Sequence, residues 1–325
     1  MQALVCEQFG PLDQLTVLEV PDPMCGPNQI RIEVAAAGVN FVDALFVQGR
    51  YQIKPPTPFI AGSEIAGVVA EVGNEVTGWV TGDRVMASIG LGGFADQIVA
   101  RPEQLHRVPD ELDLATAATF TQSYCTAQFA LHHRTSVRAG DRVLVLGAGG
   151  GVGLACIDVA RAAGADVIAV ASTPDKRDAA LAQGASHVID SADDVKTLVR
   201  ELTGGGADIA VDPVGGELST TALRSLGEGG RLLIIGFASG IIADLPANQI
   251  LLRNRTVIGV DWGIWAMSNG ADQRALLDEL LGEVERGELH PIAPTQVALT
   301  AATQALADLE NRRVVGKVAL MLGVR

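Results

Sequence analysis

The 325-residue chain has few cysteines, few aromatic residues and a clear deficit of positive charge. Its four cysteines, Cys6, Cys25, Cys125 and Cys156, are far apart and form no CxxC pair. This spacing argues against a structural zinc cage or a redox-active dithiol. We therefore interpret all four as small buried apolar residues in a reducing compartment, the cytoplasm.

The charge and the hydropathy exclude further classes of protein. A formal net charge of −14 argues against nucleic acid or an anionic membrane as a partner, because both require a basic face. No run of about 20 apolar residues is present, so we expect no transmembrane helix. The first residues, MQALVCEQFG, have neither the basic start nor the long apolar stretch of a secretory signal peptide.

The hydrophobic pattern of residues 1–120 differs from that of residues 121–260. Residues 1–120 contain short strand-like runs between Gly/Pro turns, which is typical of a mostly antiparallel β unit. Residues 121–260 alternate continuous apolar runs with helical stretches, which predicts parallel strands buried on both faces of a doubly wound sheet. Helices over 271–287 and about 302–311 precede a last strand in VGKVALML, which we expect to return to the first unit.

The predicted fold is therefore α/β, with a Rossmann domain inserted late into a β-rich domain. The β-rich domain comprises residues 1–120 and 261–325, and the Rossmann domain comprises residues 121–260.

Five glycines stand within the seven residues from Gly147 to Gly153, between a predicted strand and a predicted helix. The common GxGxxG spacing fails at Val152, and the spacing that fits is Gly147-x-x-Gly150-x-x-Gly153. Glycines allow a tight turn, and a helix N-terminus offers N–H groups to a pyrophosphate. We predict a dinucleotide site here, with a flexible strand–helix turn as the alternative. Its predicted contacts are Gly147, Gly150, Gly151, Val152 and Gly153.

The end of the next predicted strand indicates which dinucleotide binds. An NAD site usually places Asp or Glu there for the ribose 2′-hydroxyl, whereas this chain continues with Ser172 and Thr173. Their hydroxyls, together with Lys176, can receive a 2′-phosphate. We therefore predict NADPH as the cofactor, although Asp175 opposes this and Lys176 could be an ordinary solvated charge at a helix start.

Several segments carry a family resemblance. They are AAAGVNFVDALFVQGRY, PFIAGSEIAGVVAEVG, GDRV, AGDRVLVLGAGGGVGLA, DPVGG, GRLLIIGFASG and VVGKVAL. Together they resemble the zinc-free quinone oxidoreductases, the group that includes zeta-crystallin, within the medium-chain dehydrogenase/reductase superfamily. The resemblance implies a Rossmann domain and a GroES-like, mostly antiparallel catalytic domain.

Zinc-containing members of that superfamily bind the metal at positions that match Asn40, Ser63 and Gln122 of this chain. None of these is a normal zinc ligand, and the four-cysteine lobe is also absent, so we expect no zinc. Zinc would polarise a carbonyl or an alcohol as a Lewis acid. Without it, hydride addition to an electron-poor quinone or enone remains feasible, because the cofactor carries the hydride chemistry.

The resemblance assigns the candidate catalytic residues. Asn40 would lie beside the nicotinamide, where its amide can donate to an oxyanion, or it could cap the following helix. Asp43 matches the acidic position of GVNxxD, where a supporting hydrogen bond or ion pair is expected. Tyr51 matches a family tyrosine that could bind a substrate oxygen, with a packing role as the alternative.

Further cofactor contacts are expected away from the glycine loop. Phe237 and Trp262 follow predicted strand ends, where ligands of parallel sheets bind, although both could be core aromatics. Thr126 begins the Rossmann domain, and Lys317 lies in the VVGKVAL segment.

The predicted function is an NADPH-dependent, zinc-independent reductase of a quinone or other activated acceptor. The alternatives are an enoyl-thioester reductase and a non-catalytic NADPH-binding or structural protein. Missing family tyrosines near positions 45, 128 and 191 keep the last alternative open. We expect a homodimer, because the last Rossmann strand, in RTVIGVDW, would otherwise be an exposed hydrophobic edge.

Overall fold

The computed structural model describes residues 1–323, which fold as two compact units. The first unit comprises Met1–Gln122 and the chain from Ile292 onward, and the second comprises Ser123–Pro291. Residues 261–291, which the sequence placed in the β-rich domain, belong to the second unit in the structure. Residues 324 and 325, also assigned to that domain, lie outside the described residues.

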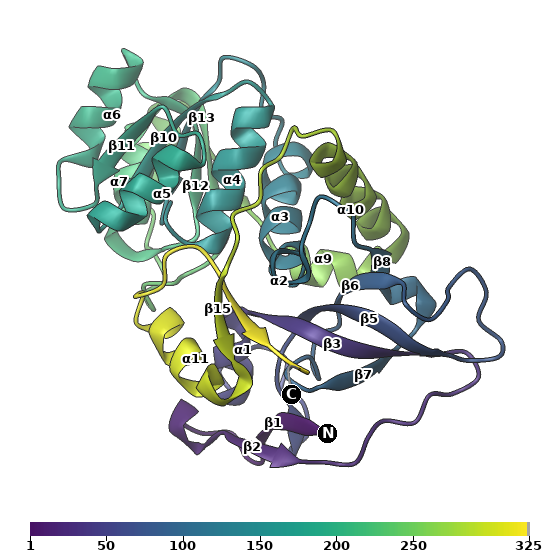
Figure 1. Ribbon diagram of the computed structural model, residues 1–325. Helices are drawn as coiled ribbons and strands as arrows, with labels where there is room; N and C mark the ends of the chain where they lie inside the picture. Colours follow the sequence, from purple (N-terminus) through teal and green to yellow (C-terminus); the bar gives the residue numbers. More distant parts are fainter. Residues whose placement is uncertain (324–325) are drawn as a thin grey trace. The chain divides into compact units, whose positions relative to one another are not determined.

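The first unit contains a mostly antiparallel sheet of the strand order β15-β16-β3-β5-β6-β8, with β7 also paired to β3 (Figure 1). Residues at alternate positions of its central strand, including Ile30, Ile32 and Val34, are buried, so this face carries the core. The strands are β3 (Ile30–Val39), β5 (Glu64–Val72), β6 (Arg84–Ser88), β7 (Gln97–Ala100), β8 (His106–Arg107), β15 (Thr295–Ala298) and β16 (Val318–Met321).

The last strand joins the two ends of this unit. β16 pairs antiparallel with β3, and Val318 lies opposite Val39. The predicted return of the chain to its first unit is therefore confirmed. A smaller sheet of β2 (Thr16–Glu19), β1 (Gln2–Cys6) and β4 (Phe59–Ile60) and the helices α1 (Phe41–Val47), α2 (Leu114–Ala117) and α11 (Ala302–Glu310) complete the unit.

The second unit is a doubly wound parallel sheet, as the continuous apolar runs predicted. Its strand order is β11-β10-β9-β12-β13-β14, with helices packed around it (Figure 1). The strands are β9 (Arg142–Leu146), β10 (Asp166–Ala171), β11 (His187–Asp190), β12 (Ala207–Asp212), β13 (Leu226–Ile234) and β14 (Thr256–Gly259).

The helices of the second unit fall between its strands, as the sequence predicted. α4 (Gly151–Ala162), α5 (Pro174–Ala182), α6 (Val195–Thr203) and α7 (Gly216–Ser225) alternate with the strands. The unit also contains α3, whose bounds are Thr121–Gln128, α8 (Ala247–Leu251), α9 (Trp262–Ser268) and α10 (Gly270–Glu285). Among residues 1–323, no helix is both long enough and apolar enough to cross a membrane.

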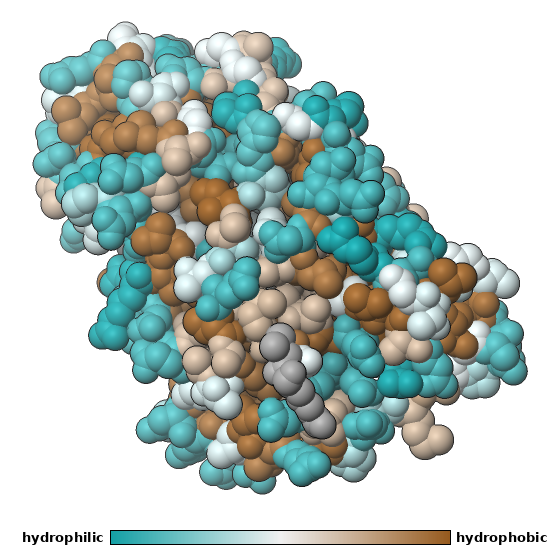
Figure 2. All heavy atoms as spheres, in the orientation of Figure 1, coloured by the Kyte–Doolittle hydropathy of each residue, from teal (hydrophilic) through white to brown (hydrophobic). Residues whose placement is uncertain are grey.

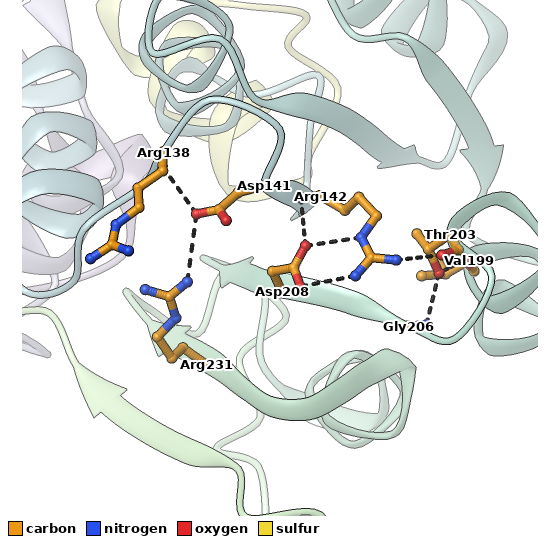
Figure 3. A network of polar contacts seen from close by, with 8 residues as sticks. All are labelled: Arg138, Asp141, Arg142, Val199, Thr203, Gly206, Asp208 and Arg231. Atoms are coloured by element: carbon orange, nitrogen blue, oxygen red, sulfur yellow. Dashed lines mark hydrogen bonds and ion pairs between the residues drawn. The ribbon is translucent and has the colours of Figure 1, made fainter.

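A polar network holds the amino ends of β9 and β12 together (Figure 3). Asp208 accepts hydrogen bonds from the backbone N–H of Arg142 at 2.8 Å and from its guanidinium Nε at 2.9 Å. The same guanidinium also donates to the Thr203 carbonyl. Because the two strands are adjacent in the sheet, this network fixes their register, and with it the position of the loops at their carboxyl ends.

One expectation about the cysteines is wrong. Cys6, Cys125 and Cys156 are buried, but Cys25 is only half-buried. Cys25 lies in the loop that leads to β3, where its thiol donates to the Gln29 carbonyl at 3.3 Å. A loop on the surface cannot bury it as a core strand would.

Candidate functional site

The glycine loop in the second unit leaves no room for a side chain at Gly147 or at Gly153. Gly147 has a φ of 58°, in the left-handed region that favours glycine. A Cβ at Gly153 would lie 2.4 Å from the Gly147 carbonyl oxygen. The start of α4 is thereby held directly against the end of β9. Both positions require glycine for physical reasons, which the alternative of a merely flexible turn does not explain.

The start of α4 can receive an anion. The first N–H groups of an α-helix have no acceptor within the helix, and no side chain caps α4 at its N-cap, Gly150. A Cβ at Gly150 would meet only the Gly147 carbonyl oxygen, at 3.5 Å. The backbone around Gly151 and Val152 is thus unshielded by side chains, which suits a pyrophosphate.

Lys176 lies over the glycine loop. A Cβ at Gly149 would come within 2.4 Å of the Lys176 Cβ, so the lysine stem packs directly against this glycine. Thr173 caps α5 by accepting the Lys176 backbone N–H at 3.4 Å, and Ser172 is exposed just after β10. The structure therefore brings the residues predicted to bind a 2′-phosphate to the same edge as the glycine loop.

The neighbouring cation has a different role. The Arg177 guanidinium donates to Asp190 at 2.7 Å and to the Ala171 carbonyl at 3.1 Å. It therefore ties α5 to the ends of β10 and β11, and Lys176 is the cation that accompanies the loop.

A buried carboxylate shapes the adjacent turn. Asp212, at the end of β12, is fully buried and accepts the backbone N–H groups of Val214 at 2.8 Å and Gly215 at 2.9 Å. It also accepts the Ser219 hydroxyl. The Val214 Cγ2 would lie 2.9 Å from a Cβ on Gly147. Asp212 thus positions the turn that packs on the glycine loop.

The first unit contains a second group of buried polar residues, contributed by α1, β5 and the loop before β16. The Asn40 amide nitrogen donates to Glu64 Oε2 at 3.0 Å and to the Gly38 carbonyl at 3.3 Å. The Lys317 ammonium donates to Asn40 Oδ1 and lies 3.9 Å from Glu64 Oε2. The other oxygen of Glu64 accepts the Gln122 backbone N–H at 3.1 Å. We call Asn40, Asp43, Glu64 and Lys317 the lysine cluster.

Within the lysine cluster, Asp43 supports Asn40. Its carboxylate accepts the backbone N–H of Asn40 at 2.8 Å, which closes the first turn of α1. Asn40 and Asp43 occupy the N-cap and N3 positions of a capping box at the start of α1. The Asn40 Oδ1 also accepts a hydrogen bond from Lys317. The capping role that the sequence left open for Asn40 is therefore compatible with its contact to Lys317, because an amide oxygen can accept two hydrogen bonds.

The ionisation of the lysine cluster is shifted by burial. Burial raises the pKa of Asp43 to about 7, although Ser63, the Asn40 N–H and the Lys317 charge act in the opposite direction. Burial also raises the pKa of Glu64, against the nearby Lys317 charge and the hydrogen bond from Asn40. The pKa of Lys317 is lowered by burial, and the two carboxylates oppose this. Both carboxyl groups of the cluster are therefore protonated more readily than exposed carboxyl groups.

The remaining predicted residues lie in several environments. Tyr51 is half-buried, with its ring centroid 4.6 Å from that of Phe46. Trp262 is buried and donates from Nε1 to Gln273 Oε1 at 2.6 Å, as expected of a core tryptophan. Phe237 follows β13 and is 38% exposed, whereas Thr126 is buried in α3.

Sequence reasoning missed Glu64. It follows Gly62 and Ser63 at the start of a buried strand and is fully buried itself. A carboxylate that opens a run as apolar as IAGVVAEV is a usable signal, because a buried charge requires a partner. The partner, Lys317, could not be assigned from the sequence.

The residues at the family's zinc positions do not fit a zinc ion. Asn40 is bonded to Lys317, whose ammonium would repel a second cation. Among residues 1–323, no group of three His, Cys, Asp or Glu side chains could hold a metal ion.

Comparison with known proteins agrees with both units. Residues 26–110 match the alcohol dehydrogenase GroES-like domain, and residues 151–278 match the zinc-binding dehydrogenase family. The chain is 36% identical over 324 residues to quinone oxidoreductase-like protein 2 of Rattus norvegicus, covering 99% of this chain and 92% of that protein. The chain therefore belongs to the quinone oxidoreductase family of the medium-chain dehydrogenase/reductase superfamily, and it is an oxidoreductase.

Solved structures show the same fold. A probable oxidoreductase from Mycobacterium abscessus is 36% identical, with a TM-score of 0.89 over 99% of this chain and 98% of that one. A mycobacterial protein solved with NADPH is 30% identical, with a TM-score of 0.90 over 99% and 100%. Other similar structures are described as an NAD-dependent alcohol dehydrogenase (30% identity, TM-score 0.90, coverage 99% and 100%) and the enoyl reductase CurK (27%, 0.88, 99% and 99%).

Proposed function

We propose that this chain is an NADPH-dependent, zinc-independent reductase that transfers a hydride to a quinone or another conjugated carbonyl compound. The observation that carries the proposal is the lysine cluster, in which an ammonium is bonded to Asn40 and neighbours Glu64. A protein cation therefore replaces the metal cation at the family's zinc positions. The four cysteines are scattered along the sequence and form no CxxC pair, which favours a reducing compartment, the cytoplasm.

The preference for NADPH rests on the glycine loop of the second unit. Lys176 packs on Gly149, and Ser172 and Thr173 end the strand without a carboxylate. A cation and hydroxyls suit a 2′-phosphate, whereas an NAD site would place an acidic residue there. The structure of a relative with NADPH supports this choice. Another similar structure is described as an NAD-dependent alcohol dehydrogenase, so the preference for NADPH over NADH requires a direct test.

The bound cofactor supplies the hydride. The glycine loop and the start of α4 hold the pyrophosphate, and Asp212 keeps the adjacent turn in place. The acceptor is already electron-poor, so the protein needs to orient it and stabilise negative charge on its oxygen rather than activate an alcohol. The first unit offers polar donors for this task, and Tyr51 is a second candidate contact to the acceptor.

The test is turnover by chelator-treated protein, with NADPH or NADH and with a small benzoquinone or a simple enone. We expect turnover with NADPH, and replacement of Lys176 by Ala should lower kcat/KM for NADPH by about 10-fold or more while NADH is little affected. Lys196→Ala, on α6 of the same unit, is the matched control. Absence of turnover with every acceptor would refute the proposal, and a preference for NADH would refute the role of Lys176.

An enoyl-thioester reductase is the second candidate, because the enoyl reductase CurK shares the fold over 99% of this chain. Parallel assays with a short enoyl thioester and a benzoquinone separate the two: faster turnover of the thioester would select this candidate. NADPH binding without turnover of any acceptor would instead indicate a non-catalytic NADPH-binding or structural protein.

We also propose that the chain forms a homodimer through β14. Among residues 1–323, this strand pairs with β13 alone and lies at the edge of its sheet, and unpaired edges readily bind another chain. The same unit exposes large apolar side chains, including Ile242 at 72% and Leu251 at 76%, and apolar patches are visible on the face drawn in Figure 2.

Light scattering at micromolar concentration should report a dimer for the wild-type protein. Leu251→Asp should shift it towards the monomer, whereas Leu181→Asp, which alters an exposed leucine on α5, should not. A monomeric wild-type protein would contradict the proposed dimer.

A further inference from the structure

We propose that Lys317 is a catalytic residue of this reaction: its ammonium hydrogen-bonds to the carbonyl oxygen of the acceptor and protonates it as the hydride arrives. The inference rests on the proposed function and changes the expected role of Lys317 from cofactor binding to substrate activation. It is carried by the hydrogen-bond connectivity of the lysine cluster.

Asn40 is the residue that the family resemblance offered as the oxyanion donor. An amide nitrogen has two hydrogens. In this structure they point to Glu64 Oε2 at 3.0 Å and to the Gly38 carbonyl at 3.3 Å. The amide oxygen is an acceptor only, and it is occupied by Lys317. Asn40 therefore has no amide hydrogen left for a substrate, and its visible task is to hold Lys317.

The Lys317 ammonium has more hydrogen-bond donors than its protein neighbours use. An ammonium has three N–H donors. One is used by Asn40 Oδ1, and the Val39 carbonyl lies at 3.4 Å, the limit of a hydrogen bond. Glu64 Oε2 is 3.9 Å away, which is an ion-pair distance and not a hydrogen bond. At least one donor is thus left for a ligand, and the Lys317 side chain is 12% exposed.

The charge of Lys317 depends on the groups around it. A buried lysine without anionic partners tends to lose its proton. Glu64 and Asp43 both favour the charged form of Lys317. Burial lowers the pKa of Lys317, the two carboxylates oppose this shift, and Asn40 fixes the direction of the ammonium. Glu64 and Asn40 are positioning residues, and Lys317 is the group that would contact the substrate.

The chemistry balances without a metal. The bound NADPH would supply the hydride and be oxidised to NADP⁺. A conjugated enone receives this hydride at its β-carbon, the carbon–carbon π electrons shift toward the carbonyl, and the carbonyl π pair moves onto oxygen. That oxygen takes a proton from Lys317 and forms an enol, which tautomerises to the saturated ketone. Lys317 is left as a neutral amine and regains a proton from water. A quinone takes up one hydride and one proton in the same way, and tautomerisation of the product gives the hydroquinone.

The experiment compares Lys317→Met and Lys317→Arg with the wild-type protein. We expect Lys317→Met to lower kcat/KM for the enone by about 10²–10³-fold, the range found when an oxyanion donor is removed. The loss should be smaller for a strongly electron-poor benzoquinone, which accepts a hydride with less stabilisation of its carbonyl oxygen. Lys317→Arg, which keeps the cation, should recover part of the activity. The NADPH dissociation constant, measured by nucleotide fluorescence, should change less than about threefold.

A solvent deuterium isotope effect gives a readout that a merely structural role would not move. It should be present in the wild-type protein with the enone and should decrease in Lys317→Met, because water then replaces the lysine as proton source. Lys54→Met, which alters an exposed lysine of the same unit, is the matched control. Melting curves identify any variant that fails to fold, and Lys317→Arg then carries the comparison.

Three results would overturn the inference, and they are distinguishable. A large rise in the NADPH dissociation constant that accounts for the lost activity would make Lys317 a cofactor ligand. Unchanged kinetics in folded Lys317→Met would make it structural. Absence of turnover by the wild-type protein would remove the proposed function, and the inference with it.

Discussion

Gly153→Ala should weaken NADPH binding by at least about 100-fold, which corresponds to about 3 kcal/mol. The added Cβ would lie 2.4 Å from the Gly147 carbonyl oxygen and 2.8 Å from the Ala148 Cα. Both atoms belong to the backbone of the glycine loop and cannot rotate away as a side chain would. The loop must therefore move away from α4, and the N–H groups that would bind the pyrophosphate lose their geometry.

Nucleotide fluorescence measures this effect directly. Gly205→Ala is a suitable control, because nothing lies within 4 Å of its added Cβ and its φ is not positive. Wild-type affinity for NADPH in Gly153→Ala would show that the cofactor does not bind at this loop.

Asp158→Ala should destabilise the second unit by about 3–5 kcal/mol, the usual cost of leaving buried charged partners unpaired. Asp158 lies in α4 and is fully buried. It accepts the Tyr124 hydroxyl at 2.8 Å, the His290 backbone N–H at 2.7 Å and the Arg161 guanidinium at 2.7 Å. One carboxylate thus joins α3, α4 and the end of the unit, and its removal deletes these three hydrogen bonds together.

Denaturation by urea, followed by circular dichroism, gives the free energy of unfolding. Tyr124→Phe removes a single hydrogen bond to the same carboxylate and should cost about 1 kcal/mol. A loss in Asp158→Ala no larger than that of Tyr124→Phe would contradict the central role assigned to Asp158.

The architecture was predictable because the signals for it are local. Continuous apolar runs identify the parallel strands β9 to β14, and the helix predicted over 271–287 differs from α10 (Gly270–Glu285) by one residue at its start and two at its end. The glycine spacing from Gly147 to Gly153 is also a local signal, because the tight turn and the close packing of α4 on β9 both require glycine within these seven residues. Such features depend on backbone sterics and on periodicity, which the sequence displays directly.

The partners within the lysine cluster were not predictable in the same way. Lys317 and Asn40 are 277 residues apart, and only the pairing of β16 with β3 brings them together. The role of Arg177 likewise depends on Asp190, on a different strand. A sequence shows which residues are unusual, such as a carboxylate that opens an apolar strand, but the choice of partner is decided by tertiary packing.

The discontinuous first unit has a consequence for the order of events on the ribosome. The second unit, Ser123–Pro291, is one uninterrupted segment and can fold as soon as it emerges. The first unit must wait for β15 and β16, which are synthesised last. Lys317 arrives just ahead of β16, so a nascent chain can complete its nucleotide-binding unit while Asn40 and Glu64 still lack their cation. Dinucleotide binding would then precede catalytic competence during biosynthesis.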